Sequence, residues 1–355
     1  NKYINLRKDS YIYMSKNKII IIIFILLVTI TIIIGFNSTK KSYAVGTTLV
    51  ENVKALNKGS SWSAGASGVY YTNSHEYRYV GANVNNYVKF NNDMYRIIGV
   101  FDSNSHGKSG EMVKLIRSRP LGGYSWGVYN ATNTSDTYCK SDWTGNTTGV
   151  KANLNVLLNE YFYNKTNTSS TYGPCVDWTY YSVCENCRTN NCSLIVGYGI
   201  EESLRGYIET ATWYLYGSYS SSSDSKQNWY LCERGGNSCT SGDNGKYSTS
   251  TEEKIGLMYL SDYLYASSYF SSTDTTKNYD TDFRSNNWLY KGTEWTLTLR
   301  SDSSCWIVPD DSFHDRGTYM DESVRPTFYL KSSVYVTGGD GSFDNPFTLG
   351  CDDCN

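Results

Sequence analysis

The sequence predicts an α+β fold in which short antiparallel strands, two main helices and long loops form a disulfide-stapled domain. Many apolar runs of strand length are separated by Gly, Asn and Ser turns. Two other segments carry apolar residues at helical spacing. All 10 Cys follow one N-terminal apolar run. Because 39% of the residues are hydrophobic, the chain can bury a core, which excludes wholesale disorder.

An apolar run over residues 19–36 predicts that the chain is exported. Lys16 and Lys18 precede the run, and a small-x-small motif ending at Ala44 follows it. Residues 1–44 are therefore interpreted either as a signal peptide cleaved after Ala44 or as a retained membrane anchor. The positive charge before the run favours an outside location for everything after it. The prediction is an extracytoplasmic protein, secreted or N-terminally anchored at the cell surface.

The rest of the chain divides by composition into three parts. Residues 45–75 are small and polar and are predicted to be a linker. Residues 76–350 are predicted to form a single extracytoplasmic α+β domain, a length that can bury one large core. Residues 351–355 are predicted to be a C-terminal tail that contains cysteine.

Apolar runs, several of them alternating with polar residues, predict the strands of this domain. Residues 87–101 fit two strands joined by a turn at Asn91, Asn92 and Asp93. Pro326 lies within the last run and indicates an edge strand or a bend there. The further strands are expected at residues 113–117, 255–260, 295–299, 305–308 and 324–330.

Helical spacing marks two segments. Residues 200–216 are predicted to be a helix because Glu201 and Glu202 would lie in its first turn, where the helix dipole favours acidic groups. Residues 217–250 are rich in Ser, Gly and Asn and are predicted to be long surface loops. The other helix is predicted from apolar residues that share one face, namely Leu154, Leu157, Leu158, Tyr161 and Phe162.

The cysteines predict disulfides, because their number is even and the chain is predicted to enter an oxidising compartment. Cys232 and Cys239 flank a turn-rich loop and form the simplest candidate pair. Four further cysteines could be stapled within their own segment: Cys175, Cys184, Cys187 and Cys192.

A zinc site is the alternative interpretation of two of these motifs. Cys184 with Cys187 and Cys351 with Cys354 have the C-x-x-C spacing of a zinc ribbon. The two motifs are much farther apart in sequence than the halves of ordinary zinc modules, and export favours oxidised sulfur. We therefore predict disulfides and no metal.

Several motifs, taken in order along the chain, resemble a known family. They are IGLMYLSDYLYA at residues 255–266, WTL at 295–297, VRPTFYL at 324–330, and GGDGS and NPFTL at 338–349. Together with the segments at 85–92 and 95–101, they are similar to a family of uncharacterised exported proteins of gut-type Gram-positive bacteria. The resemblance covers roughly residues 80–350. More loosely, the closing pattern resembles the C-type-lectin-like fold in its formylglycine-generating-enzyme variety, which implies a fold but no function.

Candidate ligand-binding residues gather in the C-terminal third. Exposed rings could stack on sugar rings, although the same residues could instead be core and loop anchors. Asp310 and Asp311 lie in an oxygen-rich loop, and Asp340, Ser342 and Asp344 lie in another. Such loops can bind calcium but more often form solvated Asx turns, so no cofactor is required. The aromatic candidates are Trp288, Tyr290, Trp295, Trp306 and Tyr319.

Arg325, which precedes Pro326, is expected to be structural, since a guanidinium can tie together the carbonyl groups of neighbouring loops.

These observations predict an exported binding module, adhesin-like, whose partner is a glycan or a surface protein. The body contains no Lys/Arg run, which argues against nucleic acid as a partner. The membrane is a partner only if the N-terminal helix is uncleaved. No catalytic motif is present, so a non-enzymatic role is favoured. The alternatives are an extracellular glycan hydrolase, which would need two carboxylates about 5–10 Å apart in a cleft, and a structural envelope component.

Overall fold

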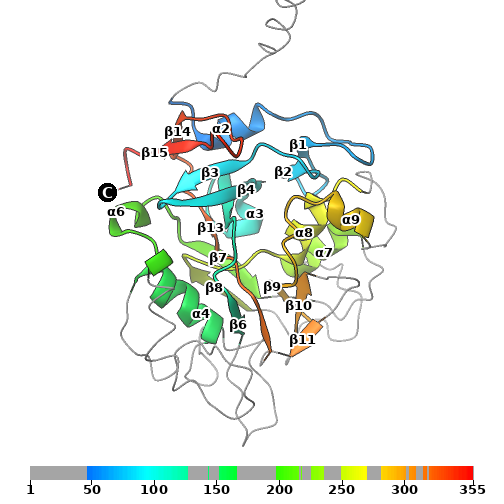
Figure 1. The fold of residues 1–355 in the computed structure, drawn as a ribbon, viewed down its shortest axis with the longest axis vertical. Helices are drawn as coiled ribbons and strands as arrows, with labels where there is room; N and C mark the ends of the chain where they lie inside the picture. The colour runs from blue at the N-terminus through cyan, green and yellow to red at the C-terminus, as the bar shows by residue number, and fades with distance from the viewer. Residues whose placement is uncertain are drawn as a thin grey trace, which may run out of the picture. The chain divides into compact units, whose positions relative to one another are not determined.

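A computed structural model describes most of the chain after residue 45. All described residues belong to one compact unit, residues 43–355 (Figure 1). Within them no helix has the length and hydropathy needed to span a bilayer, and the predicted export segment at 19–36 lies outside them. The described residues are 46–126, 143, 152–165, 197–215, 217, 225–235, 249–269, 281–300, 304–308, 315–317 and 320–354.

A six-stranded antiparallel sheet forms the centre of this unit. Its strand order is β1-β2-β4-β5-β13, and β3 pairs with β4 off this path. Strand β5 is buried at every residue, and β4 is buried over most of its length, because both lie inside the sheet and are covered by other elements. The strands are β1 (Gly68–Tyr71), β2 (Tyr77–Val80), β3 (Tyr87–Phe90), β4 (Asp93–Phe101), β5 (Met112–Arg117) and β13 (Thr327–Tyr329).

A second sheet has five strands in the order β11-β10-β9-β12-β6. Its pairings are antiparallel except for that between β12 and β9. Two hairpins complete the β structure, β14 with β15 and β7 with β8. The strands of the second sheet are β6 (Gly123–Ser125), β9 (Glu294–Leu299), β10 (Ser304–Val308), β11 (Asp315–Gly317) and β12 (Asp321–Ser323). Those of the hairpins are β7 (Ala211–Leu215), β8 (Thr249–Glu253), β14 (Tyr335–Gly338) and β15 (Thr348–Gly350).

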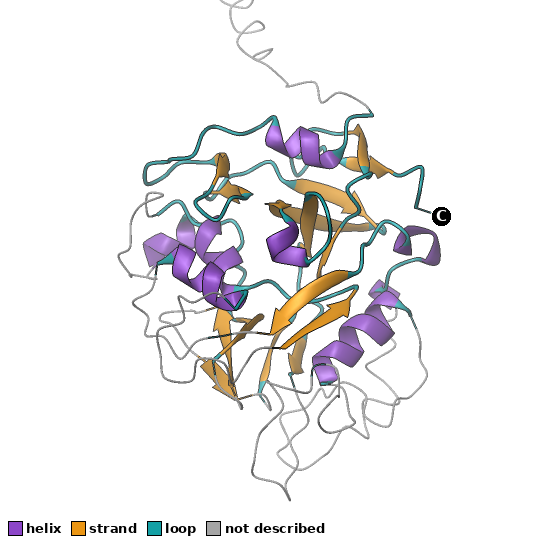
Figure 2. Cartoon of the chain, turned by 180° about the vertical axis from the view of Figure 1, so that it is seen from behind, coloured by secondary structure: helices purple, strands orange, loops and turns teal. Residues whose placement is uncertain are grey.

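The helices are short and lie around the sheets (Figure 2). Thr48 caps the first of them, because its hydroxyl oxygen accepts a hydrogen bond from the Glu51 amide while the Glu51 carboxylate accepts one from the Thr48 amide. Helices α7 and α8 pack against each other. The described helices are α2 (Leu49–Lys54), α3 (Ser103–His106), α4 (Asn153–Asn155), the π-helix η1 (Val156–Tyr163), α6 (Glu202–Arg205), α7 (Lys226–Glu233), α8 (Leu260–Ala266) and α9 (Thr281–Ser285).

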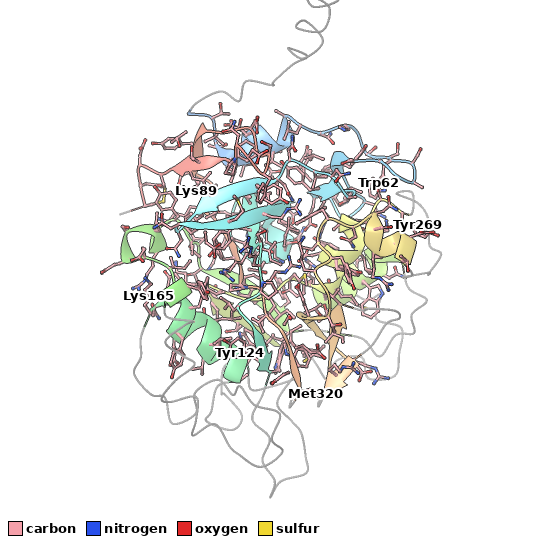
Figure 3. All side chains as sticks on the ribbon, in the orientation of Figure 1. Trp62, Lys89, Tyr124, Lys165, Tyr269 and Met320 are labelled. Carbon is pink, nitrogen blue, oxygen red and sulfur yellow. A yellow bond between two sulfur atoms is a disulfide. The ribbon has the colours of Figure 1, made fainter. Side chains whose placement is uncertain are left out.

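Aromatic side chains fill much of the interior between these elements (Figure 3). Trp126 lies against both Trp143 and Trp295, with ring centroids 5.1 and 5.8 Å apart respectively. Offset and edge-on ring pairs of this kind add to the stabilisation that comes from burying apolar area. The abundance of Tyr and Trp in the sequence therefore serves the core to a large extent.

The predicted fold class is confirmed at the level of a mixed α+β unit with mostly antiparallel strands and short helices. The hairpin at 87–101 and the strands at 113–117, 295–299 and 305–308 are present, and the run 324–330 contributes β13 after Pro326. The helical face at 154–162 is also present, as α4 continued by η1.

The predicted linker at 45–75 is wrong. Helix α2 and strand β1 lie inside that range, and Val53 and Val69 are buried in the main core. The residues are small and polar on average, but the few apolar ones are spaced to reach the core. At the other end, Cys354 is also buried, so residues 351–354 pack on the unit rather than forming a loose tail.

Two predicted elements have the wrong type. Residues 200–216 form only the short helix α6, and strand β7 follows, because the segment 211–215 alternates between buried and half-buried residues. Residues 255–260 are not a strand: Gly256 exchanges two backbone hydrogen bonds with Thr327, and α8 begins at Leu260.

The predicted surface loops at 217–250 include a helix instead. Helix α7 starts after Ser225, whose side chain accepts a hydrogen bond from the Asn228 amide, and it buries Trp229 and Tyr230. Its apolar face was hidden in the sequence by the Ser- and Gly-rich residues on either side.

The turn between β3 and β4 yields a testable prediction. Asn91 and Asn92 have φ of 54° and 57°, the type I′ geometry that favours Gly at the second position. Replacing the exposed Asn92 with Gly should raise the free energy of unfolding by up to about 1 kcal/mol, and Asn92→Val should lower it by about 1–2 kcal/mol. Urea denaturation of both variants checks this, and equal stabilities would contradict the turn geometry. Asn91 is left unchanged because its side chain bonds to Gly199 O and the Glu201 amide.

Candidate functional site

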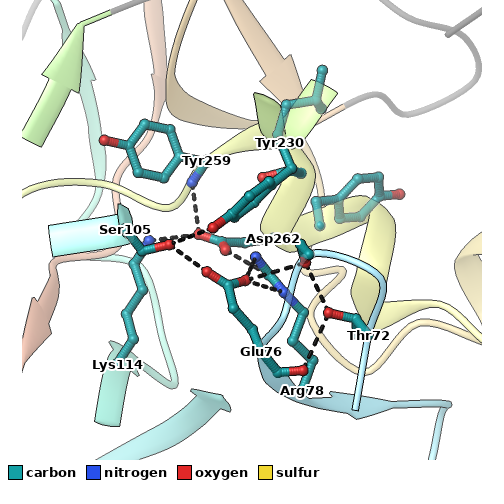
Figure 4. Close-up of polar contacts among 12 residues, drawn as sticks. Thr72, Glu76, Arg78, Ser105, Lys114, Tyr230, Tyr259 and Asp262 are labelled. Carbon is teal, nitrogen blue, oxygen red and sulfur yellow. Dashed lines mark hydrogen bonds and ion pairs between the residues drawn. The ribbon is translucent and has the colours of Figure 1, made fainter. Parts of the chain in front are cut away.

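A dense group of charged side chains lies inside the unit, between the central sheet and helices α7 and α8 (Figure 4). We call it the buried charge cluster. Its side chains are at most 6% exposed, although they carry formal charges. The cluster consists of Glu76, Arg78, Lys114, Glu233, Arg234 and Asp262.

Asp262 is the centre of the cluster. One carboxylate oxygen, Oδ1, accepts a hydrogen bond from Arg78 NH1 at 2.8 Å. The other, Oδ2, accepts from Lys114 Nζ at 2.7 Å and from the Tyr259 amide at 2.9 Å. Asp262 lies in the first turn of α8. Its hydrogen bond from the Tyr259 backbone N–H caps the helix, and its negative charge interacts favourably with the helix dipole. One side chain thus ties α8 to strands β2 and β5.

Glu76 and Ser105 extend the hydrogen-bond network from Arg78 to Arg234. Glu76 Oε2 accepts from Arg78 Nε at 2.9 Å and from Arg78 NH2 at 2.5 Å. Glu76 Oε1 accepts a short hydrogen bond from the Ser105 hydroxyl, which also accepts from Arg234 Nε at 3.0 Å. Both Arg78 bonds therefore end on one oxygen of Glu76, and they are charge-assisted hydrogen bonds, which are stronger than those between neutral groups.

Glu233, at the end of α7, accepts hydrogen bonds from the next layer of the structure. Its Oε1 accepts from the Ser261 amide at 3.0 Å and from the Thr298 hydroxyl at 2.6 Å. Its Oε2 accepts a short bond from the Ser261 hydroxyl. Burial raises the pKa of Glu233, and the opposite charge of Arg234 counteracts that rise. Glu233 therefore joins α7 to α8 and to strand β9.

Lys114 is the cation of the cluster that loses its proton most easily. Burial lowers its pKa to about 8, and the nearby Arg78 and Arg234 oppose its charge further, while Asp262 supports it. Burial alone would raise the pKa of Asp262, but the cations Lys114, Arg78 and Arg234 outweigh that effect and hold it well below its usual value. Because arginine does not deprotonate in proteins, Lys114 is the group from which a proton can leave.

The cluster cannot act on an external glycan through Glu76 and Asp262. These two carboxylates share Arg78, and both are 0% exposed. A hydrolase needs its carboxylate pair in a cleft that admits substrate. Within the described residues, this cluster instead holds together β2, β5, α7, α8 and β9.

The structure places two of the predicted ligand-binding rings in the core, which contradicts that role for them. Trp288 is 3% exposed and donates its indole N–H to Tyr79 O at 2.7 Å. Trp295 is 1% exposed and donates to Tyr124 O at 2.7 Å. Trp295 lies on β9 and Trp288 in the turn that follows α9, and the main core covers both. Tyr290 is half-buried against Tyr263.

The other predicted ligand residues are not brought together by the described structure. Only the backbone of Trp306 is described, paired with Asp315 between β10 and β11. Tyr319, Asp310 and Asp311 lie outside the described residues.

Arg325 takes part in a second buried ion pair. Its Nε donates to Glu294 Oε2 at 2.7 Å, and its NH2 donates to Leu289 O at 2.6 Å. The next residue, Pro326, accepts a hydrogen bond from the Arg117 amide at 3.0 Å. These bonds give both residues a structural place at the junction of the two sheets.

The cysteines of the last segment form a disulfide between Cys351 and Cys354. Their sulfurs are therefore oxidised, although with Asp353 they form a group of ligand-type atoms within 4.8 Å of one another. Cys232 and Cys305 are also disulfide-bonded. The remaining predicted disulfide cysteines lie outside the described residues: Cys175, Cys184, Cys187, Cys192 and Cys239.

The loop between β14 and β15 presents the most exposed large apolar side chain among the described residues. Phe343 is 61% exposed, and its ring meets the Tyr87 ring edge-on with the centroids 5.4 Å apart. We call residues 340–345 the Phe343 loop. The adjacent Asp344 and Asn345 are also exposed.

The backbone of the Phe343 loop is held by its own hydrogen bonds. The Asp340 carboxylate accepts from the Ser342 amide at 3.0 Å, and the Ser342 hydroxyl accepts from the Asn345 amide at 3.2 Å. Gly341 has φ of 76°, and a Cβ there would lie 2.7 Å from Asn85 O. The loop therefore requires glycine where it contacts the backbone at Asn85. Asp340 and Ser342 thus form the Asx-type turn that was the alternative to calcium binding.

Comparison with known proteins adds no family. No family model, no curated protein and no solved structure matches this chain.

The buried charge cluster is not among the site residues predicted from the sequence. Its one visible signal is Lys114 inside an otherwise apolar strand, where a charged residue has to find a partner.

Proposed function

We propose that this chain is an exported glycan-binding module, secreted or anchored at the cell surface, with the Phe343 loop as its contact surface. The observation that carries the proposal is the 61% exposure of Phe343 on a loop fixed by its own hydrogen bonds. An aromatic ring exposed on a preorganised loop binds with little loss of conformational entropy.

The residues beside Phe343 favour a sugar as the ligand. A phenyl ring packs against the CH-rich face of a pyranose, while carboxylate and amide groups bond to its hydroxyls. Asp344 and Asn345 supply those groups next to the ring. Export is supported by the apolar run at 19–36 and by disulfides, because all four described cysteines are disulfide-bonded. The C-type-lectin-like fold and the kinship with exported Gram-positive proteins belong to the same proposal.

The proposal predicts a large effect of one substitution on binding. Phe343→Ala should weaken the affinity for a glycan identified on an array by about 30-fold, equivalent to about 2 kcal/mol for a central contact residue. Isothermal titration of wild type and variant measures this. Tyr198→Ala is the matched control, because Tyr198 is 45% exposed on a different segment and packs on Arg117. It should leave the affinity unchanged.

Two outcomes would count against the glycan proposal. One is the absence of binding on glycan and mucin arrays at high protein concentration. The other is glycan binding that Phe343→Ala does not weaken. If a protein partner binds through Phe343 while all glycans fail, the loop is a contact surface for protein instead.

A further inference from the structure

We propose that Lys114 and Asp262 join after folding in an intramolecular amide bond between Lys114 Nζ and Asp262 Cγ. The two groups meet at 2.7 Å, from a central strand and from the first turn of α8. Both side chains are 0% exposed. They are separated by 148 residues in sequence, so only the folded chain brings them together.

Aromatic side chains surround the Lys114 amine and remove it from water. Its Nζ lies 4.6 Å from the Tyr259 ring centroid, 5.3 Å from those of Phe101 and Trp213, and 5.4 Å from that of Tyr329. All four of these side chains are 0% exposed, so they replace the water that would hydrate an ammonium. Desolvation lowers the pKa of Lys114 to about 8, which makes the neutral amine accessible near physiological pH.

Arg78 is positioned to activate the carboxyl group. Its NH1 donates to Asp262 Oδ1 at 2.8 Å, the oxygen that does not contact Lys114. When nitrogen attacks Cγ, negative charge develops on Oδ1, and a fixed guanidinium stabilises it in the manner of an oxyanion hole. Asp262 is ionised beside Arg78, Arg234 and the Lys114 ammonium, so it brings no proton of its own. Both protons needed at Oδ2 come from Lys114, which lies 2.7 Å from that oxygen.

The step balances within the ion pair. The Lys114 ammonium transfers one proton to Asp262 Oδ2, which gives an amine beside a carboxylic acid. The nitrogen attacks Cγ, a C–N bond forms, and the nitrogen loses a second proton to Oδ2. The Cγ–Oδ2 bond then breaks and water leaves. An ammonium and a carboxylate become one neutral amide and one water, with no oxidant or co-reactant.

Other Lys–carboxylate pairs in the described structure lack this environment and serve as internal controls. Lys54 and Glu111 meet at 2.6 Å, but their side chains are 35% and 38% exposed. Lys165 and Glu201 meet at 2.5 Å and are 24% and 55% exposed. Hydration keeps both partners of such pairs charged, and a charged ammonium is not a nucleophile. These pairs are expected to remain ion pairs.

The decisive measurement is the intact mass of the purified full chain after complete reduction and alkylation. The expected mass is one water below that calculated, with every cysteine alkylated, for the chain that begins at its measured N-terminal residue. Tandem mass spectrometry of a digest should place the link between the peptides that contain Lys114 and Asp262, with the peptides of Lys54 and Glu111 unlinked. A full sequence mass for the folded wild-type chain would overturn the proposal.

Two variants test the chemistry. Lys114→Met fills the ring-lined site without an amine and should restore the full sequence mass; a persisting loss of water would place the dehydration elsewhere and overturn the proposal. Asp262→Asn offers a carboxamide to the same amine and should lose ammonia in place of water. Because the wild-type mass is decisive alone, failure of either variant to fold leaves the test intact.

Discussion

Asp262→Ala is expected to lower the free energy of unfolding by about 3–5 kcal/mol, the cost of removing one partner from a buried charge pair. Its carboxylate accepts hydrogen bonds from Arg78, Lys114 and the Tyr259 amide. The side chains of both cations, Arg78 and Lys114, are buried away from water. Removing the carboxylate leaves two cations buried beside each other and α8 without its N-terminal acceptor. Loss of the proposed amide would act in the same direction.

Urea denaturation and thermal unfolding of the full chain measure this effect. At about 2–4 °C per kcal/mol for a protein of this size, the midpoint should fall by roughly 10 °C. The control is Glu201→Ala, which removes one partner of an exposed ion pair with Lys165 and should change stability by less than about 1 kcal/mol. Equal stabilities of Asp262→Ala and wild type would show that the cluster contributes nothing to the fold.

Gly99→Ala is expected to have the second large effect, about 3 kcal/mol of destabilisation from overpacking inside the sheet. Gly99 lies on β4 opposite Arg78 of β2, where the β4–β5 register shifts. A Cβ at this position would lie 2.2 Å from Tyr77 O, a backbone atom that cannot rotate away. The two strands would have to separate at the point from which Arg78 reaches Asp262.

The same two unfolding measurements test Gly99→Ala. Gly197→Ala is the matched control, because a Cβ there meets nothing within 4 Å and its φ is not in the left-handed region. That variant should stay within about 0.5 kcal/mol of wild type. If both alanine variants are equally stable, the close approach of β2 and β4 at Gly99 is not a constraint on the fold.

Local elements with a complete pattern in their own residues were predictable from the sequence. The β3–β4 hairpin was predictable because alternation and two Asn residues at the turn both indicate it. The face that packs in α4 and η1 was visible in the spacing of Leu154, Leu157 and Leu158. The same holds for the mixed α+β class, since it depends on local periodicity alone.

The roles of the charged and aromatic residues, by contrast, depend on contacts between segments that are far apart in the sequence. Trp288 and Trp295 are of a residue type that is common in binding surfaces, yet each donates its indole N–H to a backbone carbonyl inside the core. Lys114 and Asp262 are 148 residues apart and carry no shared motif, so no local pattern pairs them. Whether a side chain is buried, and which group it bonds to, depends on how segments far apart in the sequence pack together. The periodicity of one segment carries no information about which other segment packs against it.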